Sequence, residues 1–266
     1  MKNMPSVLIL RASAASFLIA ALVACSSTPD KPKPADLPAN VALLGVRQAW
    51  SAKLGDVSFP LTTSVSGNTV AVASNNGTLL ALDSATGREL WRASVGTPLS
   101  AGVGSDGKVT AVVTRDNEVV ALEAGRVLWR QRLGAQTYTA PLVAGGRVFL
   151  LAADRSVTAF DGQTGRRLWN QQRTGEALVL GQSSVLMAVG DSLVAGMSGR
   201  LVGMNPANGS TRWEAAIAAP RGTNEVERLV DLVGSVSRVG NVVCARAFQS
   251  AVGCVDAQAG RLLWTK

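Results

Sequence analysis

Residues 81–91 read ALDSATGRELW, and the chain repeats this short pattern several times, which indicates the type of fold. Residues 159–169 (AFDGQTGRRLW) and 254–264 (CVDAQAGRLLW) carry an aspartate, a turn glycine and a closing tryptophan in the same places. Looser copies end at Trp129 and Trp213. Successive tryptophans of the chain lie 41, 38, 40, 44 and 51 residues apart. A period of about forty residues indicates one supersecondary unit that is used repeatedly.

Each unit reads as a series of short strands separated by turns. In the first unit, apolar or β-branched runs cover residues 60–65, 69–74, 78–83 and 88–95, and turn-forming residues lie between them. Four short antiparallel strands joined by tight turns form one blade of a β-propeller. No long segment outside the N-terminal region keeps a helical period. We therefore predict an all-β propeller of four-stranded antiparallel blades, about five of which are present.

The tryptophans are predicted to pack between adjacent blades, where a large flat side chain buries most area. Trp50 has no full unit before it, and residues 46–54 are predicted to form a lone outer strand. In closed propellers, such a strand often completes the last blade and joins the two ends of the chain.

Composition argues against several functions. The chain has 266 residues and a net charge of +8, but its arginines are scattered, which is typical of solvated turns rather than of a nucleic-acid surface. An anionic partner or membrane surface is the alternative. Four arginines share one turn position: Arg88, Arg126, Arg166 and Arg261. The chain has no histidine, which removes Ser-His and Cys-His nucleophile pairs and histidine-ligated metals. We expect no catalytic residue, metal or cofactor, although composition alone leaves carboxylate chemistry open.

Residues 1–24 are predicted to be a lipoprotein signal peptide. A basic start precedes the apolar run of residues 12–24, which is too short to span a bilayer. Residues 22–25 read LVAC and resemble a bacterial lipobox, with cleavage before Cys25 and lipid on its thiol. An ordinary buried cysteine is the alternative.

Residues 25–40 contain prolines and charged residues and are predicted to be a flexible tether, followed by the propeller in residues 41–266. Ser26 follows the lipobox cysteine, where an aspartate usually retains lipoproteins at the inner membrane. The resemblance therefore implies a lipid-anchored protein on the periplasmic face of the outer membrane.

Cys244 and Cys254 occupy the positions that Ala71 and Ala81 hold in the first unit. These positions lie symmetrically about a short turn, on neighbouring strands. A cross-strand disulfide is one prediction, because the periplasm is oxidising. Two separate small core residues are the other.

The Asp-x-x-Thr-Gly-x-x-x-Trp repeat resembles the PQQ-like propeller repeat. Quinoprotein dehydrogenases carry it, as do the BamB lipoproteins of the outer-membrane β-barrel assembly (BAM) machinery. Residues 220–231, PRGTNEVERLVD, resemble the Gly-x-Thr-Glu-Ile-Asp/Glu-Arg-Leu-x-Asp loop of BamB proteins. With the lipobox, this loop favours the BamB family, and the resemblance runs from Cys25 to Lys266.

The resemblance implies an eight-bladed scaffold without catalytic activity. It implies docking on the periplasmic POTRA domains of BamA within the BAM complex, assistance to barrel insertion, and contact with unfolded outer-membrane proteins. Eight blades need about 350 residues at this period, so we expect the 266-residue chain to be C-terminally incomplete.

Two loops of the family are implicated in partner binding. One carries Leu-x-Leu-Arg-Gly-x-Ser; here Leu178 and Leu180 remain, with the glycine and serine, but the arginine is missing. The other implies contacts at Glu225, Arg228 and Asp231, although Val233 replaces an expected second aspartate. From the residues alone, the two leucines also fit a strand core, and the second loop also fits a solvated turn with an internal Arg228 ion pair.

Two other functions compete with the scaffold. One is a periplasmic propeller that binds another protein or a cell-wall polymer. The other is a fragment of a PQQ-dependent dehydrogenase. The dehydrogenase prediction is disfavoured because the chain is short, has no adjacent cysteines and places most of its aspartates at the repeat turns.

Overall fold

The computed structural model describes residues 36, 45–57, 59, 61–175 and 178–266. The predicted signal peptide, Cys25 and all of the predicted tether except Asp36 lie outside these residues. Residues 48–266 form one compact unit. Within the described chain, no helix is long and apolar enough to cross a membrane.

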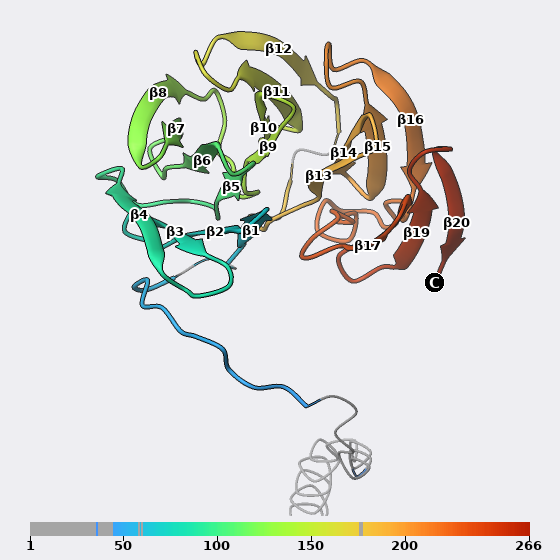
Figure 1. Ribbon diagram of the computed structural model, residues 1–266. Helices are drawn as coiled ribbons and strands as arrows, with labels where there is room; N and C mark the ends of the chain where they lie inside the picture. Colours follow the sequence, from blue (N-terminus) through green and yellow to red (C-terminus); the bar gives the residue numbers. More distant parts are fainter. Residues whose placement is uncertain (1–35, 37–44, 58, 60, 176–177) are drawn as a thin grey trace, which may run out of the picture. The chain divides into compact units, whose positions relative to one another are not determined.

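The described residues form twenty strands in five antiparallel sheets, called blades 1 to 5, whose strands pair in chain order (Figure 1). Blade 1 has β1 (Ser64–Ser66), β2 (Thr69–Ala73), β3 (Thr78–Asp83) and β4 (Glu89–Ser94). Blade 2 has β5 (Gly104–Ser105), β6 (Val109–Val113), β7 (Glu118–Glu123) and β8 (Arg126–Arg132). Blade 3 has β9 (Leu142–Ala144), β10 (Arg147–Leu151), β11 (Ser156–Asp161) and β12 (Arg167–Gln172). Blade 4 has β13 (Leu186–Val189), β14 (Ser192–Met197), β15 (Arg200–Met204) and β16 (Thr211–Ala216), and blade 5 has β17 (Ser237–Val239), β18 (Val242–Arg246), β19 (Val252–Asp256) and β20 (Arg261–Thr265).

The blades stand side by side, with the first strand of each innermost and the fourth outermost (Figure 1). Apolar side chains of the middle strands fill the space between neighbouring blades. One cluster joins Val113 and Ala121 of blade 2 to Val148 and Phe160 of blade 3, and comparable clusters join the other neighbours. The predicted propeller of four-stranded antiparallel blades is therefore confirmed.

Each blade is attached to the next by a tryptophan. Trp129 at the end of blade 2 is 8% exposed, and its indole Nε1 donates a hydrogen bond of 2.9 Å to the Gly162 carbonyl in the β11–β12 turn. Gly165 of that turn has φ +70°, and a Cβ atom there would lie 2.6 Å from the Trp129 ring. Trp169 makes the same contact with the Pro206 carbonyl at 3.0 Å. The tryptophan of one repeat thus packs on the glycine turn of the next repeat, and this contact forms part of the interface between blades.

The aspartate of the repeat shapes the turn that receives the tryptophan. Asp161 Oδ1 accepts hydrogen bonds from the Thr164 backbone N–H at 2.8 Å and from the Thr164 hydroxyl at 2.8 Å. These bonds hold the pKa of Asp161 below its ordinary value of 3.8. Asp83 is bonded in the same way by Thr86, and its pKa is also lowered.

This lowered pKa predicts a pH-dependent contribution to stability. A carboxylate with a folded-state pKa below its unfolded value stabilises the fold above the unfolded pKa, and the contribution is lost as pH falls through the folded pKa. Asp161→Asn removes the titration and keeps a side-chain oxygen, as in Asn205 of blade 4. We expect a lower melting temperature than the parent at neutral pH and a difference that shrinks as pH falls below the ordinary pKa of 3.8. Thermal unfolding of both proteins across this range is the measurement. A difference that stays constant with pH would contradict the assignment.

The two ends of the array depart from the prediction. Residues 46–54 form no strand, and Trp50 and Leu54 instead pack on Leu80 and its neighbours in blade 1. Trp50 nevertheless docks on blade 1, where its Nε1 donates to the Ser84 carbonyl at 3.0 Å. Trp264 is 47% exposed, and among the described residues no sheet follows blade 5, so here this tryptophan does not lie between two blades as predicted.

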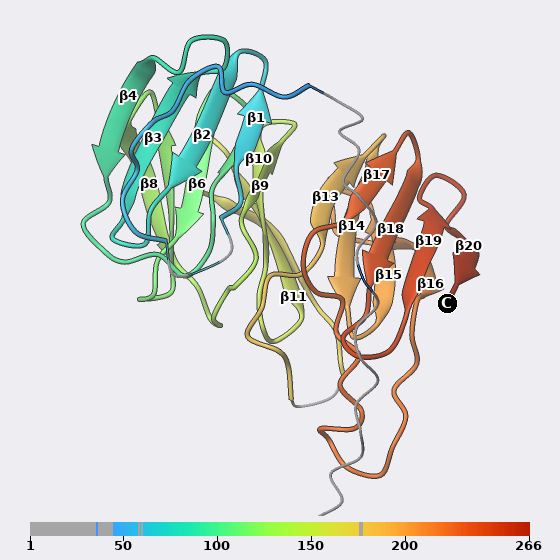
Figure 2. The same cartoon turned by 90° about the horizontal axis from the view of Figure 1, so that it is seen from below.

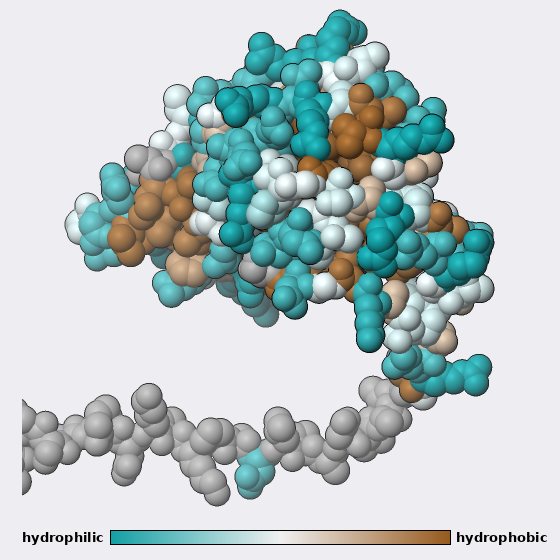
Figure 3. Space-filling view, turned by 90° about the vertical axis from the view of Figure 1, so that its left-hand side faces the viewer, coloured by the Kyte–Doolittle hydropathy of each residue, from teal (hydrophilic) through white to brown (hydrophobic). Residues whose placement is uncertain are grey.

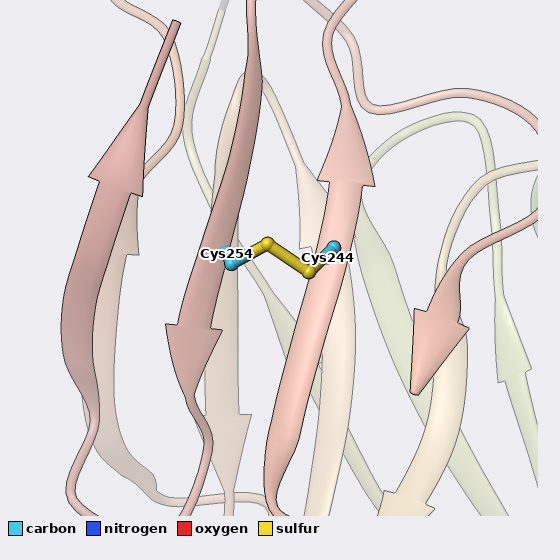
Figure 4. The surroundings of a disulfide bond; sticks show 2 residues. All are labelled: Cys244 and Cys254. Carbon is cyan, nitrogen blue, oxygen red and sulfur yellow. A yellow bond between two sulfur atoms is a disulfide. The ribbon is translucent and has the colours of Figure 1, made fainter. Parts of the chain in front are cut away.

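Cys244 on β18 and Cys254 on β19 face each other directly in the strand register. A disulfide joins them, with their Cα atoms 4.0 Å apart (Figure 4). The equivalent cross-strand pairs are Ala71 with Ala81 in blade 1 and Ala111 with Ala121 in blade 2. The bridge therefore occupies a position that small side chains fill elsewhere.

The face shown in Figure 3 is mainly hydrophilic, with separate hydrophobic patches. All four turn arginines named above are exposed, as predicted for solvated turns. Some large apolar side chains on the outer strands are also exposed, among them Leu90 on β4 at 42% and Val127 on β8 at 44%.

Candidate partner-binding site

Two loops that are distant in sequence meet beside blades 3, 4 and 5. We call residues 178–184 the leucine loop and residues 220–234 the charged loop. The Leu180 backbone N–H donates a hydrogen bond of 2.9 Å to Asp231 Oδ2. The Ser184 hydroxyl donates to the Leu232 carbonyl at 2.6 Å, and Gly234 N–H donates to the Ser183 carbonyl at 2.9 Å. The structure thus brings together the two segments that the resemblance implicated.

The first part of the charged loop is shaped by its own side chains. Asn224 Oδ1 accepts from the Glu227 backbone N–H at 2.9 Å, and Glu227 Oε2 accepts from the Thr223 backbone N–H at 2.8 Å. This reciprocal pattern resembles the capping box at helix starts. The bond from Thr223 N–H is the main cause that lowers the pKa of Glu227. Glu227 therefore stabilises this turn. The spacing of Asn224 and Glu227, three residues apart as in a capping box, is a sequence pattern that indicates such a turn.

The predicted residues occupy different parts of this site. Leu178 is 37% exposed, whereas Leu180 and Asp231 are half-buried. Glu225 and Arg228 of the charged loop are exposed. The segment between β16 and β17, which contains the charged loop, extends past the strand ends (Figure 2). The leucine loop contains no strand, so the alternative in which its leucines form a strand core is wrong.

Val233 lies where a second aspartate was expected. Its side chain is 4% exposed, and its backbone N–H donates to the Arg246 carbonyl at 3.1 Å. An apolar side chain suits this buried position, and the carboxylate nearest the leucine loop is that of Asp231.

A small cavity of about 50 Å³ lies beneath the leucine loop. Its lining includes Tyr138, Arg155, Leu180, Ser198 and Asp231. Such a volume admits a few waters at most, whereas drug-sized ligands occupy pockets of about 300 Å³ or more. Across the described chain, no three acidic or cysteine side chains are grouped so that they could hold a metal ion. The site is therefore suited to contacts on its outer surface rather than to an enclosed ligand.

Sequence comparison decides the family. Residues 44–96 and 75–266 match the family model described as outer membrane protein assembly factor BamB. The chain belongs to the BamB family. It is 38% identical over 260 residues to the outer membrane protein assembly factor BamB of Burkholderia pseudomallei, covering 96% of this chain and 68% of that protein. It is 36% identical over 245 residues to BamB of Bordetella pertussis, covering 91% of this chain and 64% of that protein.

This BamB-family chain spans about two thirds of the length of the curated relatives that it matches. The solved structure of BamB from Moraxella catarrhalis aligns with a TM-score of 0.70 at 18% identity, covering 80% of this chain and 66% of that one. A quinohemoprotein alcohol dehydrogenase from Comamonas testosteroni aligns with a TM-score of 0.57 at 15% identity, covering 80% and 43%. At such identities, these likenesses show the shared propeller fold alone. The sequence relatives are assembly factors by name, and the predicted BamB family is confirmed.

Proposed function

We propose that this BamB-family chain is a non-enzymatic scaffold lipoprotein of the BAM complex, which docks on the POTRA domains of BamA and assists insertion of outer-membrane proteins. The main support is the hydrogen bond between Leu180 N–H and Asp231, because it joins the two loops into one surface. A surface built from two loops and held by a rigid propeller is a common arrangement for partner binding.

The residues of this surface divide into an apolar anchor and a polar rim. Leu178 offers a partly exposed apolar side chain, which suits a shallow pocket on a partner. Glu225 and Arg228 are exposed charges of the charged loop, and such rim charges mainly set partner choice and association rate. Asp231 is half-buried and stabilises the surface by accepting the hydrogen bond from the Leu180 backbone N–H.

The proposed absence of catalysis rests on how the repeat aspartates are used. Asp83, Asp161 and Asp256 each accept backbone N–H hydrogen bonds within their own turns. These carboxylates therefore serve to shape the turns on which the tryptophans pack. The relatives' names as assembly factors support the same conclusion.

The proposed location is the periplasmic face of the outer membrane, with lipid on Cys25 as the anchor. Residues 25–40 then form the tether between the lipid and the propeller, which allows the binding surface to reach a membrane-bound partner. Unfolded outer-membrane proteins are the proposed clients, and no nucleic acid is involved.

Recovery of BamA from membranes tests this function. A tag placed in residues 26–40 allows the protein to be captured from membranes solubilised in mild detergent. We expect BamA to be recovered with the parent chain. We expect Leu178→Asp to abolish recovery, because a buried unpaired charge replaces the apolar anchor.

The matched control is Leu90→Asp, since Leu90 has similar exposure (42%) but lies on the outer strand of blade 1. This variant should recover BamA like the parent. Recovery of other proteins without BamA by the parent chain would overturn the proposed function. Undiminished recovery of BamA by Leu178→Asp would instead show that the leucine loop is not the contact.

A further inference from the structure

Arg155 occupies a backbone position that does not suit an arginine. It is the residue before β11 in the β10–β11 hairpin, with φ +62°. The residues at the same place in blades 1, 2 and 4 are Gly77, Asn117 and Gly199, also at positive φ. Glycine and asparagine tolerate this left-handed region, whereas a longer side chain is strained there. An arginine at this position therefore carries backbone strain that interactions of its side chain can offset.

The Arg155 side chain is buried and joins three elements. It is only 9% exposed. Its Nε donates a hydrogen bond of 2.6 Å to the Ser198 hydroxyl in the β14–β15 hairpin of blade 4. Its Nη2 donates to the Leu178 carbonyl at 3.3 Å. A permanently charged guanidinium is tolerated at such burial when polar acceptors surround it.

The segment just before the leucine loop leaves space for this guanidinium. A Cβ atom on Gly175 would lie 2.9 Å from Arg155 Nε and 3.0 Å from Cζ. A larger residue at position 175 would press on the Arg155 side chain, which would have to shift away from its present position. The backbone before the loop is thus shaped around the arginine.

The leucine loop is held from two sides. Arg155 binds the carbonyl of Leu178, and Asp231 binds the N–H of Leu180. Both groups line the same small cavity beneath the loop. Two bonds placed two residues apart restrict the backbone between Leu178 and Leu180. Arg155 itself lies under the loop, where a partner cannot reach most of it.

We propose that Arg155 is a positioning residue for partner binding, which holds the leucine loop in its binding conformation from below. Its effect on affinity rests on the proposed function, whereas its effect on the loop does not. A loop that is ordered before binding loses less conformational entropy on association, so release of the loop weakens binding.

The test is Arg155→Gly in the full chain. This variant removes the guanidinium and places at position 155 the residue that blades 1 and 4 use there. We expect amide exchange in the leucine loop to become about tenfold faster, which corresponds to the loss of one charge-assisted hydrogen bond. We expect affinity for purified BamA POTRA domains to fall by about tenfold, with little change in melting temperature.

The matched control is Asn117→Gly, which makes the same backbone change in blade 2 and should alter neither exchange in the leucine loop nor affinity. Unchanged exchange in the leucine loop of Arg155→Gly would overturn the proposal. So would faster exchange with unchanged affinity, or faster exchange throughout blades 3 and 4 with a large fall in melting temperature. If the parent chain does not bind the POTRA domains, the proposed function fails, and the exchange measurement still decides whether Arg155 positions the loop.

Discussion

Replacing Trp129 by alanine is expected to lower the free energy of unfolding by about 3–5 kcal/mol. The side chain lies between blades 2 and 3, where it packs on Phe160 with ring centroids 5.8 Å apart. Its removal leaves a cavity against Gly165, which has no side chain to fill it, and it leaves the Gly162 carbonyl without its indole donor. Denaturant unfolding followed by circular dichroism measures the difference.

Trp264→Ala is the matched control, because it changes the same repeat position on an outer strand. Trp264 is 47% exposed, so less apolar area is lost than at the 8% exposed Trp129, and the expected change is clearly smaller than for Trp129→Ala. Similar losses in the two variants would show that the tryptophan acts within its own blade. In that case the contact with the following turn would not be the main source of stability.

Replacing both Cys244 and Cys254 by alanine is expected to lower the free energy of unfolding by about 2–3 kcal/mol. The bridge closes a segment with a sequence separation of 10, which restricts the unfolded chain. The alanine pair reproduces the residues that face each other at this register in blades 1 and 2, so packing of the folded state is little disturbed.

Reduction provides the comparison for this variant. Unfolding of the parent with and without a thiol reductant should differ by a similar free energy, whereas the double alanine variant should be insensitive to reductant. A parent chain that is equally insensitive, with both thiols free to react after unfolding, would show that the pair is not oxidised.

The features that recur in the sequence were predictable, because each copy of the repeat carries the same local physics. The turns at Asp83 and Asp161 could be placed from the spacing of aspartate and glycine, and the strands on either side follow from them. The tryptophan contact was also predictable, since a large side chain recurring once per unit has to meet the neighbouring unit.

The features that occur once were not predictable in the same way. Arg155 follows Asp154 in a hairpin, where an arginine is normally solvated, and its role depends on Ser198 and Leu178 in other elements. The meeting of Leu180 with Asp231 spans 51 residues and depends on the packing of blades 4 and 5. The missing strand at residues 46–54 has the same origin, because strand formation depends on a partner that local sequence does not specify.

The contact between tryptophan and turn has a consequence for how such proteins evolve. Each interface takes its indole from one unit and its glycine turn from the next, so every segment of one full period carries two complementary half-sites. Duplication or deletion of a whole period within a gene therefore preserves the remaining interfaces. Insertion of a fraction of a period would separate an indole from its glycine. The genetic step that this architecture tolerates is the gain or loss of an entire blade.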